Sequence, residues 1–386
     1  MTVLLVGGGT GGHIKPLLAV AHELKKQGKH TRTVLVAEKG TKFDALAKSS
    51  TDIDVQERVR AGKFRRYHNE RWYKKLLDIK TFGQNVTDFF RTIAGFFDAL
   101  GVIRRTQPDV AFIKGGFVGV PMGLACAIRC VPYITHDSDT HPGLANRIIG
   151  RWARIHAVGM PEEFYAYPKA KMKFVGVPLG KEYHRVNEHD MLVYRERLDL
   201  PKSGQVISIT GGSLGAQRLN IGMELVVGIL VKEHPGLHIL HQTGASAKQL
   251  YSSLDPELRK RIRTVDFVND LACFTGAADL VVARAGATTI SELAVQHKPV
   301  ILVPNAELTG GHQLKNAKHL KRQGAVEILD ETTLRHPTEA VEMIDSLLRN
   351  PRRRKELSQA IGKLSSDNAA ASIATMIVSL LQEREA

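Results

Sequence analysis

The chain is 386 residues long, which is too long for one ordinary hydrophobic core and suits two domains. Hydrophobic residues make up 43% and charged residues 24%, a globular composition that excludes a fibre or a disordered tail. The 54 Lys and Arg residues outnumber the 39 Asp and Glu residues, giving a formal net charge of +15. This excess indicates a polyanionic partner, either nucleic acid, an anionic membrane surface or a phosphorylated substrate.

The three cysteines, Cys126, Cys130 and Cys273, are too few for a disulfide scaffold and indicate a reducing compartment. No second Cys or His pair stands at zinc-ligand spacing from them. The N-terminal segment lacks a basic n-region, so it predicts a first strand rather than a signal peptide. The longest charge-free apolar stretch, residues 117–128, is shorter than the ~20 residues that cross a bilayer. We therefore expect a protein that is made and kept in the cytoplasm.

Short β-rich runs alternate with amphipathic helical stretches, a pattern typical of parallel α/β layers. In the first half of the chain, strands are predicted at residues 3–6, 34–37, 110–113, 133–135 and 156–158. Apolar residues from Ile14 to Leu24 recur at helical spacing and predict a helix that ends at Gly28.

A second series of the same kind follows the polar stretch 181–204, which we interpret as a linker. Strands are predicted here at residues 206–210, 238–242, 264–267, 280–283 and 300–303. The strand–glycine loop–helix opening thus occurs twice, roughly two hundred residues apart, which predicts two Rossmann-like domains.

The first glycine loop, GGGTGGH at residues 7–13, lies between a predicted strand and a predicted helix. Glycines there let the backbone approach a ligand, and the helix start presents free N–H groups to an anion. Gly7, Gly9 and Gly12 also form a G-x-G-x-x-G pattern that suits a dinucleotide cofactor, with Glu38 as its acidic reader. An oxidoreductase therefore stays an alternative on this loop alone. A plain turn is disfavoured, because so many glycines cost backbone entropy that such a turn does not require.

Three further motifs follow in the second half. They are GGSLGA at 211–216, ARAGATTISE at 283–292 followed by PVILVP, and GGHQLKNA at 310–317. Together with GGGTGGHIKPLLAVA at the N-terminus, these four ordered motifs resemble the MurG family of N-acetylglucosaminyltransferases, in glycosyltransferase family 28. The resemblance runs from Met1 to about Ala325.

The resemblance implies the GT-B fold, an α/β architecture of two Rossmann-like domains with parallel sheets facing across a cleft. Residues 1–180 would form the acceptor and membrane side, rejoined by a C-terminal helix at 365–386, and residues 181–364 would bind the UDP-sugar. The implied activity is inverting transfer of GlcNAc from UDP-GlcNAc to the C4 hydroxyl of undecaprenyl-diphospho-MurNAc-pentapeptide in peptidoglycan synthesis. The family is metal-independent, so neither a metal ion nor a cofactor is expected.

The residues that the resemblance assigns to the donor lie in the second domain. They are Gly212, Ser213 and Gly215 at the diphosphate, Phe267 and Val268 at the uracil, Glu292 at the ribose, and Ala287, Thr288, His312 and Gln313 around the sugar. An amide such as Gln313 offers a sugar both a donor and an acceptor. Thr289 and Glu292 also stand at capping-box spacing, so Glu292 could instead close a helix start.

The resemblance assigns the acceptor side to the first loop, with Thr10, Gly11 and Gly12 binding substrate and His13 as first candidate for the general base. His13 could equally orient a phosphate or a sugar hydroxyl, or have no chemical role. Residues 136–139 read HDSD where the family reads HEQN, so Asp139 replaces an asparagine that contacts donor sugar or acceptor.

Two further departures from the family pattern bear on the choice of sugar and acceptor. Residues 177–180 read VPLG where the family has Asn-Pro and a nearby arginine, and Gly311 replaces an aspartate. A related UDP-sugar transferase with another lipid-linked or glycan acceptor, or an inactive relative, therefore stays an alternative.

The segment 58–79 mixes basic and aromatic residues, with eight Lys or Arg and one acid between Arg58 and Lys75. It predicts binding to an anionic membrane surface, chiefly through residues 72–79, and so a peripheral protein on the cytoplasmic face of the membrane. No RRM, KH, zinc-finger or helix-turn-helix signature is present, so we expect no nucleic-acid partner. The phenylalanines from Phe89 to Phe97 are expected to be core residues.

Overall fold

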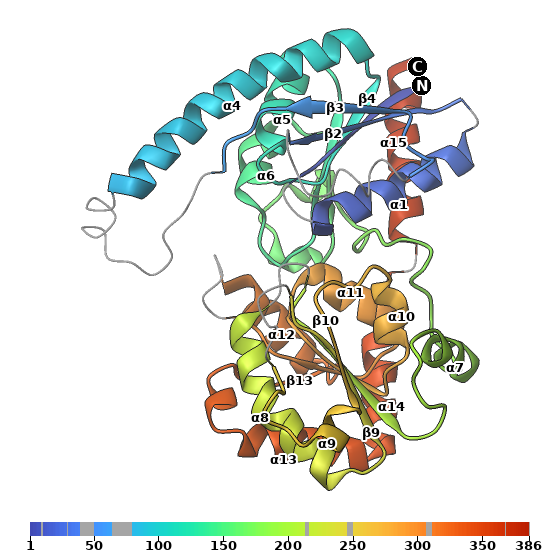
Figure 1. Ribbon diagram of the computed structural model, residues 1–386. Coiled ribbons are helices and arrows are strands. Elements are labelled where there is room, and N and C mark those ends of the chain that lie inside the picture. The colour runs from blue at the N-terminus through green and yellow to red at the C-terminus, as the bar shows by residue number, and fades with distance from the viewer. Residues whose placement is uncertain are drawn as a thin grey trace. The chain divides into compact units, whose positions relative to one another are not determined.

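The structure is a computed structural model that describes residues 1–8, 11–28, 30–38, 50–63, 79–212, 216–244, 250–305, 311–366 and 368–385. The chain divides into two compact units (Figure 1). Unit 1 comprises Met1–Lys181 and Asn368–Ala386, and unit 2 comprises Glu182–Asp367. Each unit is described by itself below.

Unit 1 is built on a seven-stranded parallel sheet with the order β3-β2-β1-β4-β5-β6-β7. Its strands are β1 Thr2–Val6, β2 Arg32–Glu38, β3 Val55–Val59, β4 Val110–Ile113, β5 Tyr133–Asp137, β6 Ile155–Val158 and β7 Met172–Phe174. Its helices are α1 Gly11–Gln27, α4 Ile79–Thr106, α5 Gly119–Ile128, α6 Leu144–Ile149 and α15 Ala369–Glu385, with 3₁₀ turns η1 Gly150–Trp152, η2 Glu162–Phe164 and η3 Lys169–Lys171.

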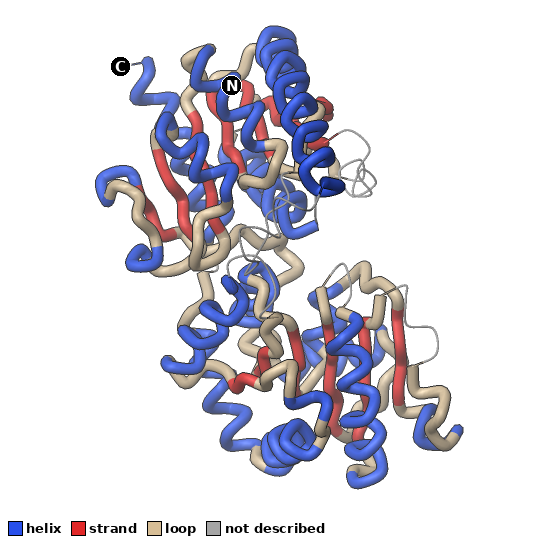
Figure 2. The backbone as a smooth tube through the Cα atoms, turned by 90° about the vertical axis from the view of Figure 1, so that its left-hand side faces the viewer, coloured by secondary structure: helices blue, strands red, loops and turns tan. Residues whose placement is uncertain are grey.

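The strands of this sheet are apolar on both faces because helices cover both (Figure 2). On one face α1 and α15 pack together, with Leu17 and Leu24 against Ile373 and Ile377. On the other face lie α4 and α5, whose Val102 and Met122 join the core. The chain therefore ends in the same unit in which it begins.

Unit 2 repeats this plan with a six-stranded parallel sheet in the order β10-β9-β8-β11-β12-β13. Its strands are β8 Gln205–Thr210, β9 Leu237–Gln242, β10 Ile262–Val265, β11 Leu280–Ala283, β12 Val300–Leu302 and β13 Glu327–Ile328. Its helices are α7 Glu188–Arg197, α8 Gln217–Glu233, α9 Pro256–Arg259, α10 Leu271–Gly276, α11 Ala287–Val295, α12 His312–Arg322, α13 Thr338–Arg349 and α14 Pro351–Gly362, with a 3₁₀ turn η5 Thr333–Arg335. Helices α8 and α13 cover one face of the sheet, and α10, α11 and α12 cover the other.

The predicted strands exist, and the differences have local causes. The sequence missed β3, β7 and β13, which lie toward the sheet edges and are short or only partly buried. Strand β10 ends at Val265 rather than at 267, because its partner β9 ends at Gln242, opposite Val265. The stretch interpreted as a linker contains α7, whose start is closed by a capping box between Asn187 and Asp190.

The expectation that Phe89 to Phe97 are core residues is wrong for three of the phenylalanines. Phe89, Phe90 and Phe97 are 51%, 63% and 64% exposed. The buried face of α4 is formed instead by small and aliphatic residues such as Gly95 and Ala99. Residues 64–78, which hold most of the predicted membrane-binding stretch, lie outside the described residues.

Within the described residues, no helix combines the length and the apolar character that crossing a membrane requires.

The contact of α4 with the segment after β3 depends on two glycines. Arg60 binds Asp98 of α4 through two hydrogen bonds of 2.7 Å, and this holds the segment against the helix. A Cβ at Gly95 would collide with the carbonyl oxygen of Arg60, and one at Gly62 would collide with that of Asp88. Backbone therefore meets backbone here with no room for a side chain.

We expect Gly95→Ala to lower the free energy of unfolding by about 1–3 kcal/mol, as overpacking does elsewhere. Gly83→Ala, in the same helix but with open space around the new methyl group, should raise it by up to ~1 kcal/mol through helix propensity. Urea unfolding followed by circular dichroism measures both changes. Equal effects of the two substitutions would contradict this account of the contact.

Candidate functional site

Each sheet has a place where the connections of two neighbouring strands leave to opposite faces. In unit 1 it lies between β1, which leads to α1, and β4, which leads to α5. In unit 2 it lies between β8, which leads to α8, and β11, which leads to α11. Ligands of open α/β sheets bind at the carboxyl ends of such strands, and the predicted site residues follow these strands in the chain.

His13 lies in the first turn of α1, directly after β1 and its glycine loop. Gly11 and Gly12 begin the helix, whereas Thr10 lies outside the described residues. A Cβ at Gly7 would lie 3.6 Å from the Cβ of His13 and 3.5 Å from the Cβ of Lys114. The Nδ1 atom of His13 is buried and has no hydrogen-bond partner in the part of the chain that is described.

The turn after β4 brings its backbone close to His13. Gly115 and Gly116 have φ angles of +98° and +75°, a region that favours glycine. A Cβ at Gly116 would lie 3.0 Å from the carbonyl oxygen of Gly8 and 3.6 Å from Cε1 of His13. This turn therefore lies close both to the first glycine loop and to the imidazole.

The loop that begins at the end of β5 forms a third side of the site. Its Asp137 is buried and accepts hydrogen bonds from Tyr167 Oη at 2.8 Å and from the backbone N–H of Gly143 at 2.9 Å. Tyr165 Oη donates to the carbonyl oxygen of Asp139 at 2.7 Å. Nε2 of His136 donates to the carbonyl oxygen of Gly176 at 2.8 Å, which attaches the loop to the segment that departs from the family pattern.

Burial and charged neighbours together set the protonation of this cluster. Burial, and then the ammonium group of Lys114, lower the pKa of His13 to about 4, while the carboxylate of Asp139 acts in the opposite direction. Burial lowers the pKa of Lys114 to about 8 against the effect of Asp137 and Asp139. The sequence predicted His13 and Asp139 here but missed Lys114. The sequence feature that could have identified Lys114 is its place between an apolar strand and two glycines.

In unit 2 the second glycine loop is held to the end of β8. Thr210 Oγ1 donates to Oε1 of Gln242 at 2.6 Å and accepts from the backbone N–H of Gly212 at 3.2 Å. Gly212 has a φ angle of +84°, which favours glycine. Ser213 and Gly215 lie outside the described residues, and α8 begins at Gln217. The loop is thus held to the end of β8 at Gly212, the last residue described before the gap.

Helix α11 begins next to the same strand end and carries three of the predicted donor residues. Gly286 is its N-cap, and Ala287 and Thr288 are its first residues. Glu292 lies inside this helix and is buried, so the alternative of a capping box with Thr289 is wrong. Burial and then the carboxylate of Glu292 raise the pKa of the hydroxyl of Tyr183.

Helix α12 brings its first turn to the ends of β11 and β12. Gly311 is the N-cap with a φ angle of +59°, so glycine rather than aspartate suits the backbone at this departure. His312 is partly buried, and buried Gln313 accepts a hydrogen bond from the backbone N–H of Asn305 at 2.9 Å. Asn316 donates to the carbonyl oxygen of Ala285 at 3.1 Å, which ties α12 to the end of β11.

The two residues predicted to read uracil follow β10, on the other side of β8 from β11. Phe267 is 55% exposed, whereas Val268 is partly buried and packs on the core. Neither donates or accepts a side-chain hydrogen bond, so a role for them in binding a base rests on backbone atoms and ring surface.

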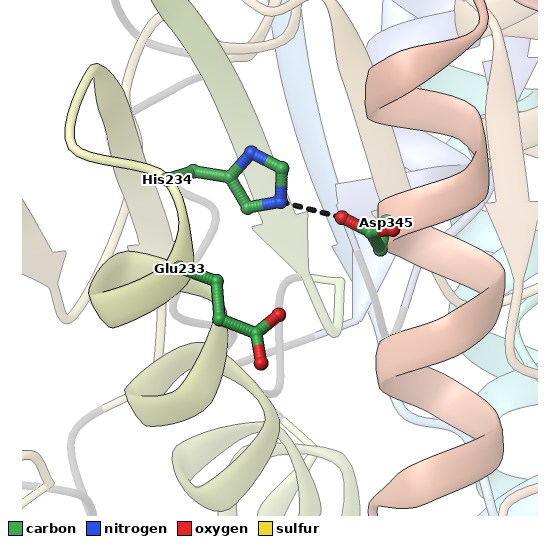
Figure 3. A group of neighbouring side chains, drawn as sticks. All are labelled: Glu233, His234 and Asp345. Atoms are coloured by element: carbon green, nitrogen blue, oxygen red, sulfur yellow. Dashed lines mark hydrogen bonds and ion pairs between the residues drawn. The ribbon is translucent and has the colours of Figure 1, made fainter.

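Among the described residues, one group of potential metal ligands lies together, Glu233, His234 and Asp345 (Figure 3). Nε2 of His234 is 2.7 Å from Oδ1 of Asp345. Nε of Arg349 also donates to both oxygens of that carboxylate, at 2.8 and 2.9 Å. A cation would have to compete with this guanidinium, so we interpret the group as a tie between α8 and α13.

Comparison with known proteins gives matches along nearly the whole chain. Residues 3–158 match the glycosyltransferase family 28 N-terminal domain, and residues 206–374 match the glycosyltransferase family 28 C-terminal domain. A curated relative from Natranaerobius thermophilus is 29% identical over 99% of this chain and 100% of its own length. A relative from Salinibacter ruber is 30% identical over 98% of this chain and 96% of its own length.

Both relatives are named UDP-N-acetylglucosamine--N-acetylmuramyl-(pentapeptide) pyrophosphoryl-undecaprenol N-acetylglucosamine transferase. Among solved structures, the crystal structure of Acinetobacter baumannii MurG matches with a TM-score of 0.71 and 23% identity. That match covers 98% of this chain and 99% of the other. At this identity the structural likeness concerns the fold, and it confirms the predicted GT-B class.

The buried histidines predict a loss of stability in mild acid. Burial lowers the pKa of His13 and His156 to about 4, that of His241 to about 3, and that of His136 well below its usual value. Between these values and about 6.5 the unfolded chain binds more protons than the folded one, so stability falls as the pH falls. Each histidine should cost about 1 kcal/mol at pH 5.5 relative to pH 7.5, partly offset by Asp137, whose pKa burial raises.

Urea unfolding at the two pH values measures the loss. The variant His241→Gln should lose less stability on acidification than the unmodified chain. Equal stability of the unmodified chain at both pH values would contradict the prediction.

Proposed function

The chain belongs to glycosyltransferase family 28, and on this premise we propose that it transfers GlcNAc from UDP-GlcNAc to undecaprenyl-diphospho-MurNAc-pentapeptide. The observation that carries the proposal is the end-to-end similarity to enzymes named for this one transfer. The alternative of an oxidoreductase that uses Gly7, Gly9 and Gly12 has no support of comparable extent.

In the proposed reaction, donor and acceptor are bound by different units. The starts of α8 and α11 in unit 2 offer backbone N–H groups and the positive ends of helix dipoles, which suit the diphosphate of UDP and its developing charge. Glu292 would accept the ribose hydroxyls. The side-chain N–H groups of Gln313 would bind the sugar, because its oxygen already accepts from Asn305.

In unit 1, His13 would take the proton from the C4 hydroxyl of the acceptor. The acceptor oxygen then forms a bond to C1 of GlcNAc while the bond from C1 to the diphosphate oxygen breaks, and UDP leaves with the electron pair. Direct displacement inverts the anomeric centre and needs no covalent sugar–enzyme intermediate. Asp139 would lie beside the base and favour its protonated form as the proton arrives.

UDP release by the purified chain tests the proposal, measured with UDP-GlcNAc in the presence and absence of a short-chain lipid-linked MurNAc-pentapeptide. Acceptor-dependent release, together with a product one GlcNAc heavier by mass spectrometry, would support it. Binding of UDP-GlcNAc without acceptor-dependent release would overturn it. That result would favour the second candidate, a family 28 transferase with another acceptor. The observation that favours this candidate is the carboxylate of Asp139 near His13, where the family has an asparagine.

The variant His13→Ala should lower kcat by about 100- to 10,000-fold, the range that general base catalysis contributes. His22→Ala is the matched control on the same helix. His22 lies more than two turns further along α1 than His13, and it pairs with Asp52. Its turnover should be unchanged. Unchanged turnover of His13→Ala would remove His13 as the base.

We also propose that unit 1 binds the cytoplasmic face of the membrane through α4, since the acceptor is a lipid. The exposed apolar residues of α4 stand three or four positions apart and form one stripe: Val86, Phe89, Phe90, Ile93 and Phe97. In the sequence, α4 follows the basic segment 58–79, of which Arg60 and Lys63 are described and exposed. Apolar side chains that enter the interface beside cations are typical of peripheral membrane helices.

The double variant Phe90→Ser/Phe97→Ser should weaken binding to anionic vesicles about tenfold or more, given ~1.5–3 kcal/mol for each buried phenylalanine. Phe174→Ser is the control, because Phe174 is also an exposed phenylalanine of unit 1, at 50%, but belongs to β7. Flotation with phosphatidylglycerol vesicles measures the bound fraction. Flotation unaffected by the double variant would overturn the assignment of the surface to α4.

A further inference from the structure

Lys114 is a buried cation that the proposed transfer leaves without a role. It follows β4 directly, its backbone N–H donates to the carbonyl oxygen of Val6 at 2.9 Å, and it is 4% exposed. Its Nζ donates a hydrogen bond to Oγ of Ser138, in the loop after β5. A single side chain therefore joins the ends of β4 and β5 at the point where unit 1 places His13.

Burying an ammonium group is costly unless nearby groups compensate for the lost hydration. The carboxylates of Asp137 and Asp139 favour the charged form of Lys114, and the hydroxyl oxygen of Ser138 accepts a hydrogen bond from its Nζ. Asp137 is itself held by Tyr167 and Gly143. The loop therefore presents a built environment for a cation, and the cation holds the loop in return.

Lys114 and His13 flank the same glycine. A Cβ at Gly7 would lie 3.5 Å from the Cβ of Lys114 and 3.6 Å from the Cβ of His13. The Cβ atoms of Lys114 and His13 are therefore no more than about 7 Å apart. A Cβ at Gly116 would lie 3.6 Å from Cε1 of the same imidazole. Lys114 and the Nδ1 atom of His13 are both buried, so water screens the effect of the Lys114 charge on the imidazole less than it would at the surface.

The charged and titratable groups that face His13 come from β4 and from β5 with its loop. Lys114 opposes a second positive charge on the imidazole, Asp139 favours it, and His136 is a further neutral imidazole nearby. Glu38, at the end of β2, lies against Gly8 and interacts with Arg91 and Lys63 instead.

We propose that Lys114 is a positioning residue for the transfer, whose ammonium group holds the loop of Asp139 at the site and adds to the effect of burial in keeping the imidazole of His13 uncharged. An uncharged imidazole retains the lone pair that must accept the proton of the sugar hydroxyl. The inference rests on the proposed function, in which His13 is that base.

The test is the titration of the Cε1–H signal of His13 by NMR, assigned by its loss in His13→Gln. In Lys114→Met the pKa of His13 should rise by ~1 unit or more, the size of effect that one nearby charge has. Lys114→Arg keeps the charge and should leave the pKa low. Lys25→Met removes a cation from the far end of α1, the helix that carries His13, and should also leave the pKa of His13 low.

The unmodified chain provides a second measurement that does not depend on the folding of a variant. Deprotonation of Lys114, whose pKa is lowered to about 8, should shift the His13 signal a second time near that pH. The acid limb of the kcat/KM profile should move to higher pH in Lys114→Met and stay in place in Lys114→Arg. A purely structural lysine would lower activity without moving that limb.

An unchanged pKa of His13 in Lys114→Met, or a flat His13 signal near pH 8 in the unmodified chain, would overturn the inference even if transfer is intact. Absence of transfer by the unmodified chain would overturn the proposed function and leave the NMR coupling as measured. The two failures are therefore distinguishable.

Discussion

The structure depends on the divergence of two neighbouring parallel strands in each sheet. Because α1 and α5 leave β1 and β4 to opposite faces, the ends of these strands are left uncovered by their own connections. Strands β8 and β11 repeat the arrangement in unit 2. The backbone can then come close to a ligand only where side chains are absent, which explains the glycines at each of these four strand ends.

The two units use the same geometry for different chemistry. Unit 1 gathers titratable groups, with His13, Lys114 and Asp139 in one electrostatic cluster that can hold and move a proton. Unit 2 gathers helix starts, a hydroxyl and amides around Thr210 and Gln313, which suit the binding of a charged nucleotide without altering its protonation. This division fits a transfer in which one unit activates the acceptor and the other stabilises the leaving group.

The sequence predicted the sheets well because their strands are buried on both faces and read as continuous apolar runs. It could not predict which face of α4 meets the core. Large apolar residues such as Phe89 favour one face, but the backbone of residues 60–62 packs against the face that carries Gly95. Lys114 was missed for a related reason. A lysine after a strand normally points to solvent, and the partner that buries it, Ser138, is distant in the chain.

The return of α15 to unit 1 has a consequence for how the protein is made. Unit 2 is a continuous insertion between two parts of unit 1, so all of its residues leave the ribosome before the last helix does. Until Ile373 and Ile377 are synthesised, the apolar face of α1 that they cover has no partner. The unit that begins synthesis first is therefore the one that completes its core last, and the nascent chain must keep that face from aggregating in the interval.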